Sequence, residues 1–465
     1  MSDRWAVLLA LATAAGALVA KTVPLGAVGG APFLVVALAL ALTVALAARK
    51  PAAACLASAA LASTLAARAW AGLDPPPPST WSGPVVFATD PSPERGGTLR
   101  FEARVGGRRV EAWARGHPAR VLADRLAGEQ VDIGGHLRPV TGKRRAYLAH
   151  RHIAARLDVR TVGTRVGPAA PPLRAANAMR RTILQGARVL PDQARALFAG
   201  FVLGDQREAD QETEQAFRRS GLSHLLVVSG SNVAFVLTLA HPALRRLRLA
   251  PRFLAGLGVL AFFALLTRGE PSVLRAGVMA GLALLATTLG RPVSTNRLLC
   301  LAVTGLLLLD PLLIGSVGFL LSVAATAGIA WLTPPLRKHL PLPIAVTAAA
   351  QIGVSPVLVP LFGGVPVVTL VANLLALPAA GPVMMWGLAA GAPAGLAPDA
   401  IATVIHAPTR VLVGWISLVA HRTAASPAAD VLLDVPHLCA LAAFAVVART
   451  GWRIASRRAA RARSP

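Results

Sequence analysis

The sequence predicts a polytopic α-helical membrane protein with a small extracellular, OB-like β domain inserted after the third helix. Of its 465 residues, 55% are hydrophobic, and many apolar runs approach the ~20 residues that cross a hydrocarbon core of ~30 Å. One long stretch instead alternates apolar and polar residues with period two, which is typical of strands. The net charge of +26 comes from 47 basic and 21 acidic residues, and nucleic acid, acidic lipid and cytoplasmic loops all remain possible reasons for it.

The apolar runs predict about twelve spanning helices, the first of them retained rather than cleaved as a signal peptide. Three form an N-terminal membrane segment (1–72), and the others lie in a second membrane domain (221–449) before a basic tail (450–465). The predicted spans are Trp5–Ala20, Pro32–Ala48, Ala52–Gly72, Leu222–Ala240, Phe253–Thr267, Ser272–Leu289, Leu298–Leu309, Leu312–Leu332, Ile344–Leu361, Val365–Leu388, Ile401–Ala420 and Leu432–Ala448.

Basic residues alternate between the connecting loops. With the N-terminus inside, all but one of the cytoplasmic connections carry a basic cluster, for example "LRRLRLAPR" and the tail "RTGWRIASRRAARARSP". Because short cytoplasmic loops are enriched in Lys and Arg, this pattern predicts a cytoplasmic-membrane protein with both termini in the cytoplasm. The same count puts the β domain outside, together with the alternate connections such as "RGEP" and "DPLL", which are short and poor in basic residues.

The β domain is expected at 85–166, after a proline-rich linker (73–84) that contains "DPPPPST". Its alternating runs, such as "TLRFEARV" and "AARLDVRTV", predict five or six strands, and the glycines in "VDIGGHLRPV" suit the bends of a small closed barrel. Such OB-like barrels commonly bind single-stranded nucleic acid by base stacking. Trp113 and Tyr147 are the candidate stacking residues, and a purely structural barrel remains the alternative.

Two kinds of helix are expected at 173–220, between the β domain and the second membrane domain. Residues Leu173–Leu190 form a basic amphipathic helix that suits the membrane interface. Further along, Asp205, Glu208 and Glu212 can share one helical face. They either bind a cation or give a helix a favourable acidic first turn.

Four polar interruptions break the apolar pattern of the second membrane domain. They are "SGSN" (229–232), "RGEPSVLRAGVM" with Arg268, Glu270 and Arg275, "GFLLS" with Ser322, and Asn373. Polar groups at membrane depth must find partners in the bundle or line a cavity. For Arg275, Glu270 is the nearest candidate partner in the sequence, although five residues is a poor helical spacing, and a water-filled path is the alternative. For "SGSN" two interpretations stay open: close packing of small residues, or a helix broken at Gly230 whose N-terminal amides face an anion.

Several kinds of chemistry have no signature in the sequence. Cys55, Cys300 and Cys439 form no disulfide or thiolate-metal motif. No phosphate-binding loop, HExxH motif or nucleophile elbow occurs. We therefore expect no enzymatic activity, cofactor or metal, and any transport must be driven by a partner, a gradient or capture on the far side.

The sequence resembles the ComEC family of competence membrane proteins. The resemblance rests on "LFAGFVLGDQRE…FRRSGLSHLLVVSGSNVAFV", "ALLTRGEPSVLRAGVMAGLALLATTLGRP", "LLLLDPLLIGSVGFLLSVAATAGI" and "LVANLLALP", which occur in the family's order. It implies a channel that carries single-stranded transforming DNA into the cytoplasm during natural transformation. By position, the family's motif residues are Gly204, Asp205, Gly221, His224, Ser229, Gly230, Pro271, Ser272, Arg275, Met279, Asp310, Pro311, Gly318, Phe319, Ser322 and Asn373, with Asn232 as a further channel candidate.

The resemblance also implies partners, and it has two departures. Beside single-stranded DNA and membrane lipid, it implies a membrane-anchored DNA receptor and a cytoplasmic DNA-handling ATPase; a separate nuclease and a homo-oligomer stay open. Asn232 stands where many members carry a histidine, which puts a proton-linked role in doubt. The metallo-β-lactamase-like domain of larger members is not expected, since the sequence has no HxHxDH motif.

Two other functions remain open on the residues alone. A secondary transporter of a small anion or lipid precursor would also use a broken helix and an intramembrane arginine. A membrane scaffold whose exported β domain binds a partner would not need Ser229, Gly230 or Asn232.

Overall fold

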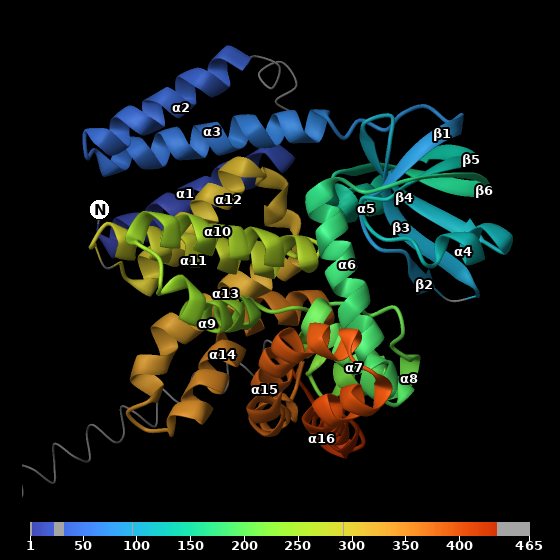
Figure 1. Ribbon diagram of the computed structural model, residues 1–465. Coiled ribbons are helices and arrows are strands. Elements are labelled where there is room, and N and C mark those ends of the chain that lie inside the picture. The colour runs from blue at the N-terminus through green and yellow to red at the C-terminus, as the bar shows by residue number, and fades with distance from the viewer. Residues whose placement is uncertain (1, 23–31, 95, 292, 435–465) are drawn as a thin grey trace, which may run out of the picture.

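Three helices open the chain, a β domain follows, and further helices pack back onto the first three (Figure 1). The computed structural model describes residues 2–22, 32–94, 96–291 and 293–434. The helices outside the β domain are α1 (Asp3–Thr22), α2 (Pro32–Ala47), α3 (Pro51–Ala71), α6 (Pro171–Gly186), α7 (Asp192–Leu203), α8 (Gln211–Arg219), α9 (Gly230–Leu244), α10 (Leu249–Leu266), α11 (Pro271–Thr288), α12 (Thr295–Leu309), α13 (Val317–Leu336), α14 (Leu342–Phe362), α15 (Thr369–Leu396) and α16 (Asp399–Ala424).

Eight helical segments among the described residues are long and apolar enough to cross a membrane, when Ser223–Leu244, which includes α9 and the turn before it, is counted as one. They correspond to the predicted third span and to seven of the later ones. The number of twelve is not confirmed: α12 and the apolar part of α2 are shorter, α1 covers the first predicted span, and Leu432–Ala448 falls largely outside the described residues. The structure is that of a helical membrane protein with an inserted β domain.

The β domain is a sheet that closes on itself. Its strands are β1 (Ser79–Phe87), β2 (Ser92–Glu94), β3 (Thr98–Val105), β4 (Arg108–Arg115), β5 (Gln130–Pro139) and β6 (Ile153–Gly167), with the short helices α4 (His117–Leu122) and α5 (Gly142–Leu148). The strand order is β1-β5-β6-β4-β3-β2, and an additional pairing of β1 with β3 closes a ring of five strands. All pairings in this sheet are antiparallel except that of β4 with β6.

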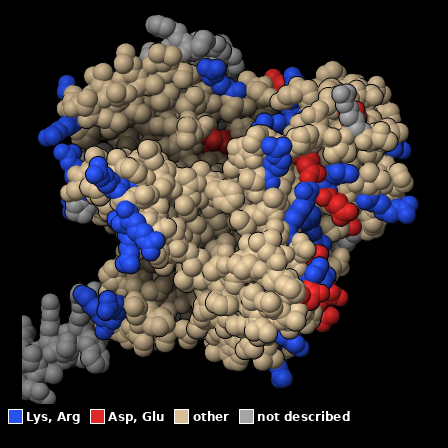
Figure 2. All heavy atoms as spheres, viewed as in Figure 1, with Lys and Arg blue, Asp and Glu red and all other residues tan. Residues whose placement is uncertain are grey.

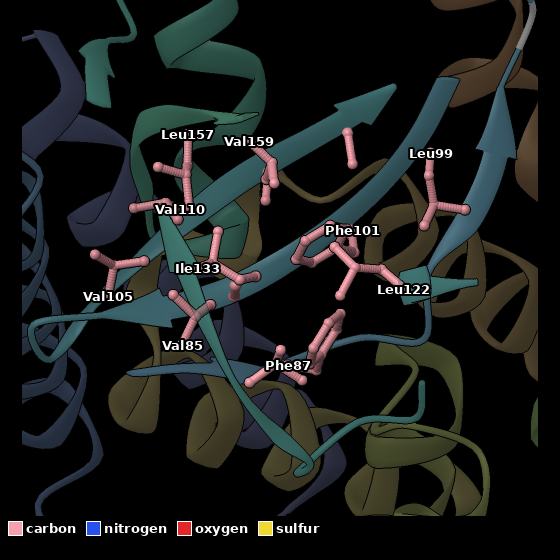
Figure 3. Packing of buried hydrophobic residues seen from close by; sticks show 14 of the residues in the cluster. Val85, Phe87, Leu99, Phe101, Val105, Val110, Leu122, Ile133, Leu157 and Val159 are labelled. Atoms are coloured by element: carbon pink, nitrogen blue, oxygen red, sulfur yellow. The ribbon is translucent and has the colours of Figure 1, made fainter. Parts of the chain in front are cut away.

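The core of the β domain follows from the alternation in its strands (Figure 3). In β3, the side chains of Leu99, Phe101 and Val105 point into the ring, and Phe101 stacks on Phe87 with the ring centroids 4.6 Å apart. Strand β1 begins at Ser79, inside the predicted linker. Its residues pair with β5 despite the proline at position 84, so the prolines of "DPPPPST" mark the end of α3 but not the start of the domain.

Glycines let several helices of the membrane part approach closely. A Cβ on Gly395 of α15 would overlap the carbonyl oxygen of Thr182 in α6, and a Cβ on Gly328 of α13 would stand 2.8 Å from the Cα of Gly353 in α14. Small residues at such crossings are characteristic of helices packed in a membrane. The predicted amphipathic helix α6 is thus held against α15, and it lies between the β domain and the helical part (Figure 1).

Basic side chains gather on the edge of the helical part that faces away from the β domain (Figure 2). Exposed Arg245, Arg246 and Arg248, in one of the loops predicted to be cytoplasmic, follow α9. The connections that contact the β domain are different ones: Arg268 pairs with Asp90, and Asp310 lies beside His152. The two ends of the helical part therefore differ in charge and in contacts.

Candidate functional site

The span that contains "SGSN" is not a continuous helix. A 3₁₀ turn, η3 (Ser223–Leu225), is followed by non-helical residues, and α9 begins only at Gly230. Ser229 occupies the N-cap position in an extended conformation, but its side chain makes no capping hydrogen bond. The structure therefore has the helix break that the sequence suggested as one of two interpretations.

Asn232 fixes the start of α9 in place. It is fully buried, and its Nδ2 donates a hydrogen bond to the carbonyl oxygen of Phe201 in α7, at 3.2 Å. The Ser229 hydroxyl donates to Asn232 Oδ1 at 3.3 Å and also lies 2.6 Å from the Ser231 hydroxyl. Because these side chains bond to one another and to α7, none of them caps the Gly230 and Ser231 amides, while the Asn232 amide donates to the Ser229 carbonyl oxygen at 3.1 Å.

Arg275 lies in the second turn of α11 and is only 5% exposed. Its Nε donates to the Ser322 hydroxyl of α13 at 2.8 Å, and its Nη1 lies 2.9 Å from the Met279 sulfur. Within the described part of the chain no carboxylate pairs with it, and Glu270, its predicted partner, instead occupies the N-cap position of α11. A buried arginine whose neighbours are neutral is costly unless water or an anion reaches it.

Three of the polar interruptions meet at this arginine. A Cβ on Gly230 would stand 2.8 Å from Arg275 Nη2, so only glycine leaves room for the guanidinium at the start of α9. The Ser272 hydroxyl donates to the carbonyl oxygen of Val228 at 2.7 Å, which ties α11 to the chain just before the break. We call Gly230, Ser272, Arg275 and Ser322 the Arg275 cluster.

Other predicted residues flank this cluster without contacting Arg275. Pro271 begins α11, Gly318 is exposed in the first turn of α13, and Phe319 is buried in a core with α1 and α12. Gly318 also has open space around it: a Cβ there would meet only the Ser316 hydroxyl, at 4.0 Å.

Asn373 belongs to a second group, on α15. It is buried and donates to the Thr369 carbonyl oxygen of its own helix at 2.9 Å. Gly221, at φ +75°, packs directly on the Thr369 side chain, and His224 is exposed with Nδ1 3.3 Å from the Gly221 carbonyl oxygen. The sequence motifs "GLSH" and "VANLL" are thus joined to each other rather than to Arg275.

A third group joins the helical part to the β domain. Asp310 accepts a hydrogen bond from the Leu312 amide, where Pro311 starts the 3₁₀ turn η4 (Pro311–Gly315), and its Oδ2 lies 2.9 Å from His152 Nε2. Leu312 packs with Leu73 and residues of the β domain.

A buried ion cluster makes the main connection between the β domain and the helices. Arg180 of α6, 2% exposed, pairs with Asp90 of the β domain at 3.0 Å and with Asp205 at 3.1 Å. Arg207 donates to both oxygens of Asp205, and Arg268 pairs with Asp90 at 2.8 Å. We call these five residues the interdomain ion cluster.

The sequence did not single out Arg180 or Asp90. The signal for Arg180 was its position between Ala176 and Ile183 on the apolar face of the predicted helix, where an arginine needs a buried partner. Asp90 carried no signal, because its partner lies far away in the sequence.

Asp205 is held as a carboxylate rather than a cation ligand. Burial alone would raise its pKa, but the hydrogen bonds and charge of Arg207 and the charge of Arg180 outweigh burial and keep the pKa below its ordinary value. Glu208 pairs with Arg195 instead. Asp205 and Glu208 of the suggested cation site are thus paired with arginines before α8 begins, and Glu212 lies in the acidic first turn of α8, as the alternative interpretation had it. Gly204, at φ +67°, ends α7 just before Asp205.

The two candidate stacking residues of the β domain differ in accessibility. The Trp113 ring is covered by arginines, with the guanidinium carbons of Arg156 and Arg144 at 4.8 Å and 5.9 Å from its centroid. Tyr147 on α5 is 65% exposed. Only Tyr147 is free to stack on a base without displacing a cation–π partner.

Two curated proteins are similar to part of this chain. "Uncharacterized protein YcaI" of Escherichia coli K12 is 27% identical over 202 residues, which is 39% of this chain and 27% of that protein. "ComE operon protein 3" of Bacillus subtilis 168 is 27% identical over 196 residues, or 41% of this chain and 25% of that protein. The matches thus span about a quarter of each relative's length.

No solved structure matches the chain. The family model described as "Competence protein" matches residues 201–458, which is more than half of the sequence and includes α9, α11, α13 and the Arg275 cluster. The chain belongs to the ComEC family of competence proteins.

Proposed function

We propose that this protein acts in DNA uptake for competence and carries single-stranded DNA across the cytoplasmic membrane into the cytoplasm. The observation that carries the proposal is the burial of Arg275 at the junction of α9, α11 and α13, where no carboxylate of the described residues pairs with it. A polyanion needs a cationic or dipole-lined path through hydrocarbon. Family membership and the similarity to "ComE operon protein 3" support DNA as that polyanion.

The proposed orientation has both termini in the cytoplasm and the β domain outside. It is supported by the contacts of Arg268 and Asp310, which lie in connections predicted to be external, with Asp90 and His152 of the β domain. Basic side chains at the opposite end suit the cytoplasmic side (Figure 2). The β domain then stands at the outer end of the proposed path.

An OB-like barrel is the proposed fold of the β domain. A closed ring of five strands with one parallel pair, β4 with β6, and a helix between β4 and β5 supports this assignment. Exposed Tyr147, beside exposed Lys143 and Arg144, is the side chain we assign to first contact with a strand.

The proposed role is transport rather than catalysis. The chain would receive DNA from a membrane-anchored receptor and deliver it to a cytoplasmic DNA-handling ATPase, with a separate nuclease removing the other strand. Membrane lipid is the proposed surrounding of the eight apolar spans, and a homo-oligomer is compatible with this arrangement.

The test is uptake of labelled DNA by the native host. A strain that lacks the gene should bind DNA at its surface but accumulate no nuclease-resistant label in the cytoplasm, and the wild-type gene should restore accumulation. Normal accumulation in the deletion strain would refute the proposal. Vesicles that contain the purified protein and accumulate a small anion, but never pass oligonucleotides, would instead favour the small-anion transporter.

A further inference from the structure

We infer that the start of α9 and Arg275 together form a binding site for one inorganic oxyanion, of the phosphate or sulfate class, which occupies the resting protein. This goes beyond DNA transport, because the site would bind free phosphate in the purified chain. Only the further step, displacement of the ion by a phosphodiester of the strand, rests on the proposed function.

The first half of the site is the uncapped end of a helix of 15 residues. The Gly230 and Ser231 amides have no helical partner, and the Ser229 side chain does not cap them, whereas the Asn232 amide donates to the Ser229 carbonyl oxygen. Such a helix end carries a partial positive charge of roughly half an elementary charge and offers amides to an anion.

The second half is the guanidinium of Arg275. The residue is only 5% exposed, and its Nε and Nη1 have neutral partners in Ser322 and Met279. Its Nη2 has no hydrogen-bond partner among the described residues and points at Gly230, the first residue of α9. A full charge thus lies against the first residue of α9.

The surroundings keep this geometry fixed. Asn232 anchors α9 to α7 by a buried hydrogen bond, and Ser272 anchors α11 to Val228 by a partly buried one, so neither half can move away without breaking one of them. Ala276 is the other close neighbour of Gly230, since a Cβ added to that glycine would stand 3.2 Å from the Ala276 Cβ. No acidic side chain of the described residues competes for Arg275.

These features select the ligand. A tetrahedral oxyanion can accept from Arg275 Nη2 and from adjacent amides at once, and oxyanions at helix starts commonly use both kinds of donor. Chloride offers a single centre and should bind more weakly. A resting ion would also neutralise a buried charge that otherwise has only neutral partners.

The test measures inorganic phosphate binding to the purified full-length chain in nanodiscs of phosphatidylcholine, by thermal shift and by ³¹P NMR line broadening, with chloride at equal ionic strength as reference. We expect saturable phosphate binding. Arg275→Gln should raise the Kd about tenfold or more, and Gly230→Ala should do the same because its Cβ would stand 2.8 Å from Nη2. Gly277→Ala, where a Cβ on α11 meets nothing within 4 Å, should leave the Kd unchanged.

The inference would be overturned if the purified protein showed no saturable phosphate binding, or if Arg275→Gln and Gly230→Ala bound phosphate with the wild-type Kd. It would also be overturned if phosphate bound in phosphatidylcholine nanodiscs but no longer bound once phosphatidylglycerol was added to them. This last result would assign the site to a lipid headgroup. A separate experiment adds a dT oligonucleotide to the phosphate-bound protein and measures by ³¹P NMR whether the oligonucleotide displaces the phosphate. If the purified protein binds phosphate as expected but the deletion strain takes up DNA normally, the proposed function is refuted and the oxyanion site still stands.

Discussion

Arg275→Ala abolishes delivery of labelled DNA to the cytoplasm while surface binding of DNA persists. The substitution removes a buried charge at the junction of α9, α11 and α13. A hydrogen bond from a charged donor contributes about 1.5–3 kcal/mol, and a strand would lose the one or more that Arg275 donates, so we expect delivery to fall on the order of 30-fold or more. Arg275→Lys should recover only part of it, since an ammonium cannot reach Ser322 and Gly230 together in the same way.

Delivery is measured as nuclease-resistant cytoplasmic label, normalised to the amount of each variant in the membrane. Arg246→Ala is the matched control, because Arg246 is exposed and lies in a loop predicted to be cytoplasmic. Equal delivery by Arg275→Ala and Arg246→Ala at equal membrane levels would contradict the assigned role of Arg275.

Arg180→Leu loosens the β domain from the helical part. Arg180 bonds Asp90, Asp205 and the carbonyl oxygens of Leu203 and Leu266 from an almost fully buried position. Asp90 and Asp205 keep Arg268 and Arg207 as partners, but the two carbonyl oxygens lose a buried, charged donor, which costs ~1–3 kcal/mol each. The free energy of unfolding should fall by that amount, and Asp90 should become accessible.

The measurement is thermal unfolding of the purified protein, together with the proteolysis rate between the β domain and α6. Arg181→Ala is the control: it is the next residue on α6, its side chain is 58% exposed, and it pairs only with Glu129. Its loss should cost ~0–1 kcal/mol. A similar effect of both substitutions would show that the interdomain ion cluster does not hold the two parts together.

Local patterns predicted much of this structure. Alternation over "TLRFEARV" gave a strand whose Leu99 and Phe101 form the core, and the sequence "SGSN" marked the helix break, because glycine and serine disfavour a helix interior and suit its start. The polar residues of α9, α11 and α13 meet because buried polar groups need partners.

Long-range pairing was not predictable. Periodicity places Arg180 on a helical face but cannot say that its partner is Asp90, which a separate domain brings close. Glu270 looked like the partner of Arg275 by proximity in the sequence, but five residues is a poor spacing on a helix, and the carboxylate stays at the helix start. Asn373 pairs within α15, so its motif meets "GLSH" instead of Arg275.

Cross-linking of a stalled strand tests the central claim most directly. Gly318 is exposed and lies one helical turn before Ser322 on the same face of α13, so a photo-reactive residue there should face the Arg275 cluster. Leu254 of α10, which is 66% exposed on the surface of the helical part, is the control position. With DNA whose trailing end carries streptavidin, we predict a DNA adduct at position 318 and none at position 254. An adduct at 254 but not at 318, during active uptake, would contradict a path along α9, α11 and α13.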